Sequence, residues 1–215
     1  MTASRRPRAR RGEGERLRDE ILQATEQLLI KTGDQEAVSI RAIAQAVGVT
    51  PPSIYLHFAD KTELIFAVCT RHFEALDAAI EAAAAEAADL VDELRARGRA
   101  YVRFGLDHPE QYRILFMSKP SAKPVAWSAD EMADNAAFSH HVDAVRRAAD
   151  VGLLGPDVDV QLTAIGFWTA VHGIVSLVIS QPDFPWPEID VLVDHVLSMQ
   201  TMGLASVASE SLGEQ

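Results

Sequence analysis

The sequence predicts an all-α fold with a small N-terminal helical domain followed by a larger helical domain. The chain has 215 residues, of which 48% are hydrophobic, and this is enough to bury a sizeable core. Alanine, leucine, glutamate and arginine are abundant, whereas glycine and proline together supply 22 residues, so the composition favours helix. Apolar residues also recur at helical spacing along most of the chain.

The composition also indicates a cytoplasmic protein. Cys69 is the single cysteine and cannot form an intramolecular disulfide, and the arginines near the N-terminus have no apolar segment behind them to make a signal peptide. The longest apolar run covers residues 163–180 and is interrupted by His172 and two glycines. We interpret it as a buried helix and expect no membrane association.

The charge is distributed unevenly. Residues 1–73 carry 11 basic and 9 acidic side chains, whereas residues 74–215 carry 9 basic and 22 acidic ones, and the whole chain has a net charge of -11. The first eleven residues contain five arginines and no acid. Residues 1–14 are expected to form a disordered basic arm that either contacts phosphates or a minor groove, or remains a solvated tail.

The first two helices are predicted from apolar spacing and from their end signals. Leucine, isoleucine and alanine recur at helical spacing between residues 15 and 31, and Gly33 then stops that helix. Ser39 can cap a second helix over residues 40–47. Gly48 follows it, where a left-handed residue would end the helix and turn the chain.

The stretch "VGVTPPSIYLHF" predicts a third helix of about two turns. Thr50 is a suitable N-cap, and Pro51 falls at the first helical position, where its missing N–H costs nothing. A fourth helix begins at "ADKTEL", where Asp60 and Glu63 form a capping box, and it extends to about residue 88.

Two short helices joined by a glycine turn, with a third helix before them, are the layout of a helix-turn-helix DNA-binding domain, placed at residues 15–60. Ile54 and Phe58 are expected to face inward. An αα-hairpin that binds nothing is the alternative. The residues expected to face DNA, through base edges or phosphates, are Ser39, Arg41, Thr50, Pro51, Ser53, Tyr55, His57 and Lys61.

The segment "SIRAIAQAVGVTPPSIYLHFADKTEL", preceded by "ILQATEQLLIKTG", resembles the N-terminal domain of the TetR family of transcriptional regulators over residues 16–66. It departs from the family pattern at Pro51, Pro52 and Leu56. The resemblance implies a homodimer that places two recognition helices in successive major grooves of a palindromic operator in double-stranded DNA. It also implies a small-molecule effector in the C-terminal domain.

The remaining chain reads as effector-binding and dimerisation helices over residues 61–208, followed by a disordered tail at 209–215. A loop with two prolines is expected at residues 118–128, and a second capping box there starts the helix that follows it. In the resembled family the last two long helices form a four-helix dimer bundle, although they could also be only monomer core. The expected helices cover residues 89–108, 109–117, 128–153, 161–180 and 189–207.

An effector site is expected among the aromatic and imidazole side chains of this domain. Trp168 and His172 are four residues apart and would share a helix face, giving an apolar wall with one polar handle. The run "FWTAVHG" resembles a Trp and His-Gly signature of one TetR subfamily, but His172 could equally be a satisfied core residue. The candidates are Tyr101, Phe104, Tyr112, Phe116, Trp127, Phe138, His141, Trp168 and His172.

Other chemistry is not indicated. No HxxxH or CxxC spacing supports a metal site, and no GxSxG, Walker or GxGxxG pattern supports an enzyme or a cofactor site. The TetR resemblance then implies a homodimeric repressor that an apolar or aromatic effector releases from its operator. A DNA-binding factor without an effector and a helical module that never binds nucleic acid are the alternatives.

Overall fold

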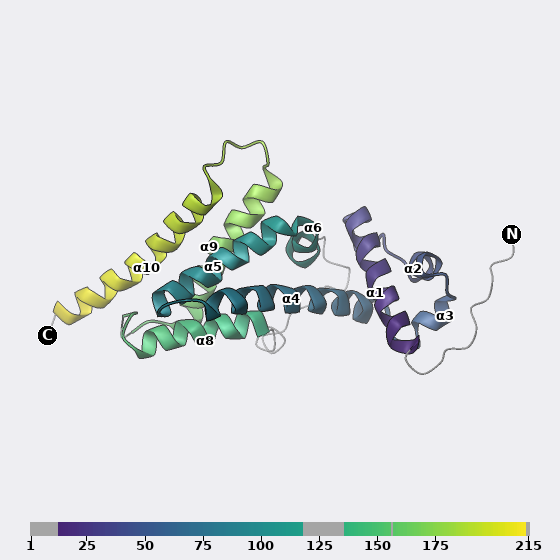
Figure 1. Ribbon diagram of the computed structural model, residues 1–215, viewed down its shortest axis with the longest axis horizontal. Helices are drawn as coiled ribbons and strands as arrows, with labels where there is room; N and C mark the ends of the chain where they lie inside the picture. Colours follow the sequence, from purple (N-terminus) through teal and green to yellow (C-terminus); the bar gives the residue numbers. More distant parts are fainter. Residues whose placement is uncertain (1–12, 118–135, 156, 214–215) are drawn as a thin grey trace. The chain divides into compact units, whose positions relative to one another are not determined.

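The structure is a computed structural model that describes residues 13–117, 136–155 and 157–213 (Figure 1). These residues form helices and no strands, which confirms the predicted all-α fold. The α-helices are α1 (Glu13–Thr32), α2 (Ile40–Val47), α3 (Pro51–Ile54), α4 (Lys61–Ala85), α5 (Leu90–Asp107), α6 (Pro109–Tyr112), α8 (Ala136–Asp150), α9 (Val160–Ser180) and α10 (Ile189–Gly213); η1 (Arg113–Met117) is a π-helix.

The described chain packs as two compact units. The first contains residues 13–72 and 110–117, and the second contains residues 73–109 and the described residues from 136 onward. Helix α4 therefore begins in the first unit and ends in the second. Its first turns belong with the N-terminal helices because Leu64, Ile65 and Val68 are buried in their core.

The core of the first unit forms where the apolar spacing predicts it. Ile54 is fully buried and Phe58 is 2% exposed, as expected for the inward side of the third helix. Val49 packs against this core from the turn between α2 and α3. Buried contributors from the other helices include Ile21, Leu29, Ile43, Leu64 and Val68.

Several helix limits differ from those predicted. Helix α3 ends at Ile54 after a single turn, and in the turn that follows the N–H groups of His57 and Phe58 both donate to the Ile54 carbonyl. Helix α4 ends at Ala85, before Asp89, whose side chain accepts from the first backbone N–H groups of α5. The segment 109–117 divides into α6 and η1.

In the second unit, α5 packs against α8, α9 and α10. Helices α5 and α10 approach closely at Gly98, where a side chain would lie 2.8 Å from a methyl carbon of the buried Leu197. Helix α10 continues to Gly213 in an alanine- and serine-containing segment without proline, so it extends over most of the segment predicted as a disordered tail.

Helix α9 is more exposed than the sequence predicts. One side carries Ala164, Phe167, Val171, Ile174 and Val175, all buried, but the other side exposes several large apolar residues in the single chain. Among the described helices, α9 alone is long and apolar enough to cross a membrane, a test that core helices of soluble proteins also pass.

Candidate nucleic-acid interface and effector site

The turn between α2 and α3 is fixed by a left-handed glycine. Gly48 has φ of 77°, and the N–H of Val49 donates to the Ala44 carbonyl at 2.9 Å. This bond satisfies one of the carbonyls left over at the end of α2. At the other end of α2, the Ser39 hydroxyl accepts from the Ala42 N–H at 3.2 Å, as predicted for a cap. Both ends of α2 are thereby defined, and the start of α3 is positioned.

Helix α3 begins differently from a standard capped helix. Thr50 occupies the N-cap position, but its hydroxyl makes no cap bond to the backbone and instead lies 3.0 Å from the Ser53 hydroxyl. Pro51 and Pro52 occupy the first two helical positions, so this turn begins without two of the N–H groups that other residues would present.

The predicted DNA-facing residues are accessible to different degrees. Tyr55 is 53% exposed, and Ser39, Arg41 and Thr50 are also exposed. Pro51, Ser53 and His57 are half-buried. Two further exposed residues on this segment were not among the predicted candidates, Pro52 and Leu56, the latter at 84% exposure. Their apolar side chains gave no signal for hydrogen-bonded recognition, which is why the prediction omitted them.

Lys61 is engaged within the N-terminal unit. Its ammonium group donates to the Gln35 carbonyl at 3.0 Å and lies 3.6 Å from a carboxylate oxygen of Glu36. Lys61, which was expected to face DNA, is therefore tethered to the loop before α2 in this structure. Asp60 caps the next helix as predicted, because the Glu63 N–H donates to Asp60 Oδ1. The Glu63 carboxylate accepts from the N–H of Ala59, one residue before the cap, and not from that of Asp60 as a capping box requires.

In the second unit, Trp168, His172 and Ser176 follow one another at four-residue spacing on α9, and Trp168 and His172 contact Tyr101 of α5. The Trp168 indole N–H donates to the Tyr101 hydroxyl at 3.2 Å. That hydroxyl lies 3.3 Å from His172 Nδ1, and Ser176 Oγ lies 3.1 Å from His172 Nε2. An indole N–H can only donate, so the Tyr101 oxygen accepts from Trp168. The proton of the Tyr101 hydroxyl is then available to His172 Nδ1. We call these four side chains the polar ladder.

Burial lowers the pKa of His172, which favours the neutral ring in this ladder. The neutral tautomer with Nδ1 accepting from Tyr101 carries its proton on Nε2, facing Ser176.

His141 of α8 is a second buried imidazole in the same unit. Its Nε2 lies 3.1 Å from the Ala164 carbonyl oxygen, and because a carbonyl only accepts, this nitrogen carries the proton. The ring stands edge-on to Phe167, with the ring centres 6.2 Å apart. Burial lowers the pKa of His141 to about 4.

The remaining effector candidates have different neighbours. Phe138 stands edge-on to Trp168 with the ring centres 6.0 Å apart, so it extends the polar ladder on the α8 side. Phe104 instead contacts His108. Tyr112 and Phe116 contact each other and belong to the first unit. Trp127 lies outside the described residues, as do the predicted basic arm through residue 12 and the predicted loop with its capping box.

Sequence reasoning missed a buried arginine. Arg97 of α5 is 5% exposed, and its guanidinium donates to Glu81 at 2.6 Å and to Glu93 at 2.9 Å. Glu93 also accepts from Arg147 of α8. The hydrogen bond from Arg97 lowers the pKa of Glu81. The i, i+4 spacing of Glu93 and Arg97 was visible in the sequence, but the partners on α4 and α8 depend on packing.

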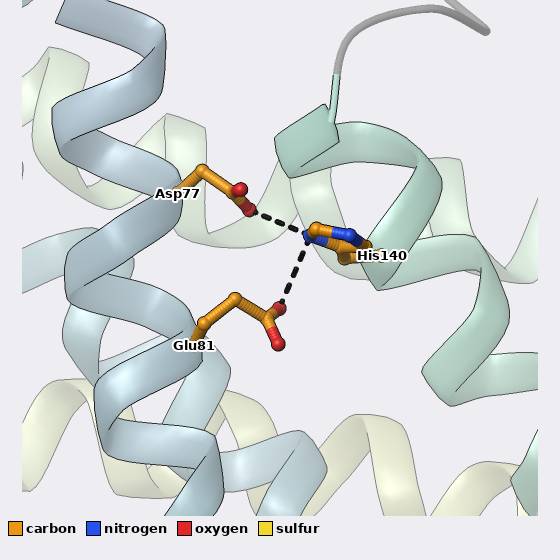
Figure 2. A group of neighbouring side chains, drawn as sticks. All are labelled: Asp77, Glu81 and His140. Atoms are coloured by element: carbon orange, nitrogen blue, oxygen red, sulfur yellow. Dashed lines mark hydrogen bonds and ion pairs between the residues drawn. The ribbon is translucent and has the colours of Figure 1, made fainter.

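Beside this arginine, Asp77 and Glu81 of α4 point toward His140 of α8 (Figure 2). His140 Nδ1 lies 3.0 Å from Asp77 Oδ1 and 3.5 Å from Glu81 Oε1. These residue types can ligate a divalent cation, and their ligand atoms lie within 4.8 Å of one another. The same Glu81 oxygen already accepts from Arg97, so in this structure the cluster is an ion-pair network that joins α4, α5 and α8.

The glycine turn between α2 and α3 and the buried core behind it define a helix-turn-helix protein with a helical C-terminal domain. The family model for bacterial regulatory proteins of the tetR family matches residues 21–68, and the model for the tetracyclin repressor-like C-terminal domain matches residues 94–199. The chain belongs to the TetR family of transcription regulators.

Individual relatives agree with this assignment. The HTH-type transcriptional activator FasR of Mycolicibacterium smegmatis is 30% identical over 137 residues, which is 63% of this chain and 61% of that protein. A protein of unknown function from Rhodococcus sp. RHA1 is 28% identical with a TM-score of 0.72, over 88% of this chain and 95% of that one. A TetR family regulator from Marinobacter aquaeolei VT8, 24% identical with a TM-score of 0.70 over 89% and 97%, shares the fold.

Proposed function

We propose that this protein binds a palindromic DNA operator as a cytoplasmic homodimer and that a small molecule in its C-terminal domain controls this binding. The observation that carries the proposal is the segment 50–57. It stands on the Gly48 turn with Ile54 buried behind it and Tyr55 exposed in front. A helix held in this way enters the major groove of DNA, while the neighbouring backbone and polar groups contact phosphates.

The exposed side of α9 supports a dimer. Leu162 is 66% exposed, Ile165 36% and Leu177 52% in the single chain, and their spacing places them along one stripe of the helix. Gly166 and Gly173 lie on the same stripe, with open space where a side chain would stand, so a second helix can approach closely there. On α10, Val191 and Met199 are also exposed. Such a contiguous apolar surface favours association between copies.

The polar ladder supports an effector site in the second unit. Tyr101, Trp168 and His172 join hydrogen-bonding groups to aromatic surface, and Phe138 and His141 lie on the neighbouring helix α8. This combination suits a small apolar or aromatic molecule with one polar group. Such a molecule acts by binding more tightly to one of two states of the dimer, the state that binds DNA or the state that does not.

The protein represses where its operator overlaps a promoter and an effector releases it. Its relative FasR is a transcriptional activator, so the experiment must be able to detect either a fall or a rise in transcription from an operator-bearing template when the protein is added. A fall in transcript that the effector reverses is the expected result, and a rise would assign activation to this chain.

The decisive experiment is selection of bound sequences from random duplex DNA with the full-length protein at low salt. We expect an inverted repeat whose half-sites lie about one helical turn, roughly 10 base pairs, apart, with affinity that falls as salt rises. If no inverted repeat is enriched, the proposed function is wrong.

Two variants separate DNA binding from assembly. Tyr55→Ala should weaken operator binding and leave the dimer intact, as measured by light scattering. Leu177→Arg should produce monomers, because it places a charge on the apolar stripe, and should weaken operator binding in turn. Val151→Arg is the matched control because Val151 is 62% exposed and lies outside α9 and α10. Dimers that persist in Leu177→Arg would exclude the α9 stripe as the interface.

A further inference from the structure

We propose that Asp77 and Glu81 of α4 and His140 of α8 form a binding site for a divalent transition-metal ion of the zinc type (Figure 2). All three residues belong to the second unit, so the site does not depend on the proposed DNA binding. In the single chain these side chains pair with one another, and a cation can take the place of the proton that they share.

Two helices supply the ligands. Asp77 and Glu81 are four residues apart, so both carboxylates lie on one face of α4. The ring of His140 points at the two carboxylates from α8 (Figure 2). His140 is 63 residues from Asp77, so no local spacing in the sequence could reveal this set of two oxygen ligands and one nitrogen ligand.

The distances within the cluster suit one ion. His140 Nδ1 lies 3.0 Å from Asp77 Oδ1 and 3.5 Å from Glu81 Oε1, and all three ligand atoms lie within 4.8 Å of one another. Zinc binds nitrogen and carboxylate oxygen at about 2.0–2.2 Å, so two ligands of a tetrahedral ion lie about 3.3–3.6 Å apart. Small side-chain rotations therefore suffice, and the proton on His140 Nδ1 leaves to solvent when the ion binds.

The charge around the cluster favours a cation. Glu81 and Glu93 are paired with the two neighbouring arginines, Arg97 and Arg147. Asp77 is a further carboxylate, and its side chain is only 16% exposed. The local arginines therefore leave one largely buried negative charge, and a buried charge is costly unless it is paired or coordinates a metal.

Arg97 does not block the site. A carboxylate has two oxygens and about four lone-pair directions, so Glu81 can accept from Arg97 and still bind an ion. Carboxylates that bind metals commonly accept such a second hydrogen bond, which fixes their orientation. An open cleft of about 300 Å³ lies beside the cluster and is lined in part by Glu81, His140 and Asp143, so water can reach the ion as a further ligand.

The ligand types select the class of cation. Imidazole nitrogen with carboxylate oxygen suits zinc and its neighbours among the transition metals, whereas Mg²⁺ and Ca²⁺ prefer oxygen ligands. Preference for Zn²⁺ over Mg²⁺ is therefore part of the proposal.

The first test is isothermal titration of the full-length, metal-stripped protein without an affinity tag. We expect saturable binding of one Zn²⁺ per chain. Co²⁺ should give visible absorption bands that Zn²⁺ then removes, and Mg²⁺ should not compete. If Zn²⁺ gives no saturable binding, or if Mg²⁺ binds as tightly, the proposal is wrong while the proposed function stands.

The second test assigns the ion to this cluster. Asp77→Asn and His140→Gln remove one ligand each and should weaken Zn²⁺ binding at least about tenfold, because even an outer partner of a metal ligand is worth about 10–100-fold. Zn²⁺ should also raise the unfolding temperature of the wild type more than that of either variant. Glu81→Gln replaces a variant whose circular dichroism shows loss of helix.

His108→Gln is the matched control, because His108 is an exposed imidazole of the same unit outside the cluster. It should retain the wild-type affinity for Zn²⁺. If the cluster variants retain that affinity as well, the ion binds elsewhere and the proposed site is excluded. If His108→Gln alone loses it, the site is excluded in the same way.

Discussion

Trp168 of α9 and Tyr101 of α5 are joined by a hydrogen bond of 3.2 Å from the indole N–H to the phenol oxygen, and the same oxygen lies 3.3 Å from His172 Nδ1. One hydroxyl therefore connects two aromatic side chains of α9 to the helix packed against them. The four-residue spacing of Trp168 and His172 places both side chains on one face of α9, where each reaches the Tyr101 hydroxyl.

Tyr101→Phe removes that hydroxyl and keeps the ring. Trp168 and His172 each lose a partly buried hydrogen bond, so we expect the free energy of unfolding to fall by about 1–3 kcal/mol. Urea denaturation measures the change. Tyr55→Phe, which removes the same group from an exposed ring, is the control and should cost less than about 0.5 kcal/mol. Equal losses in the two variants would contradict a structural role for the ladder.

The polar ladder also illustrates what the sequence can and cannot predict. The four-residue spacing of Trp168 and His172 predicts a shared face, and the structure confirms it. The partner Tyr101 is 67 residues from Trp168, so nothing in the local pattern identifies it. Spacing within one helix is visible in the sequence, whereas the pairing of helices depends on tertiary packing.

The same distinction applies elsewhere in the chain. The roles of Gly48, Ser39 and Asp60 at helix ends are predicted correctly because helix ends depend on neighbouring residues. The length of α3 is not predicted correctly, because the extent of a short helix depends on tertiary packing and no local signal marks its end at Ile54. Arg97 is missed because its burial depends on carboxylates from α4 and α5 that meet only in the folded unit.

His141 should make stability depend on pH. Its pKa is lowered from 6.5 to about 4 by burial, so between these values the unfolded chain binds a proton that the folded chain does not. The contribution of His141 to the free energy of unfolding is therefore highest above pH 6.5. It falls as the pH drops toward 4, by up to about 3 kcal/mol in all. The lowered pKa of His172 acts in the same direction.

Urea denaturation at pH 7.5, 6 and 5 measures this dependence. His141→Gln retains a polar side chain at the Ala164 carbonyl but does not titrate, so its free energy of unfolding should fall less between pH 7.5 and 5 than that of the wild type. An unchanged pH dependence in this variant would assign the effect to other groups.

Arg97 should be important for the stability of the second unit. Arg97→Ala removes the buried cation between Glu81 and Glu93. Because Glu81 is 40% exposed and Glu93 keeps its ion pair with Arg147, the loss should be about 1–3 kcal/mol, less than for a charge left fully buried and unpaired. Arg97→Lys keeps the charge but cannot bond both carboxylates through a planar fork, so it should also be less stable than the wild type.

The control for Arg97 is Arg103→Ala. Arg103 pairs with Asp190 at 3.3 Å, but both side chains are highly exposed, and an exposed pair contributes at most about 1 kcal/mol. Thermal unfolding of the three variants should give the order Arg103→Ala, Arg97→Lys, Arg97→Ala from most to least stable. If Arg103→Ala lowers the unfolding temperature as much as Arg97→Ala does, burial of an ion pair does not determine how much that pair contributes to stability.

Gly98 should tolerate no side chain, because α5 and α10 meet at this position. A methyl group added there would lie 2.8 Å and 2.9 Å from the two terminal carbons of Leu197, which is 1% exposed and has little room to move. Overpacking of this kind costs about 1–3 kcal/mol, so Gly98→Ala should unfold at lower urea concentration although alanine is the better helix former.

Two further variants test the cause of that loss. Gly14→Ala, in α1, has no neighbouring atom within 4 Å and should be neutral or stabilising by up to about 1 kcal/mol. In the Leu197→Ala background, where the opposing methyl groups are absent, Gly98→Ala should cost less than in the wild type, because the two changes share one contact. Equal costs in the two backgrounds would show that Leu197 is not what excludes a side chain at residue 98.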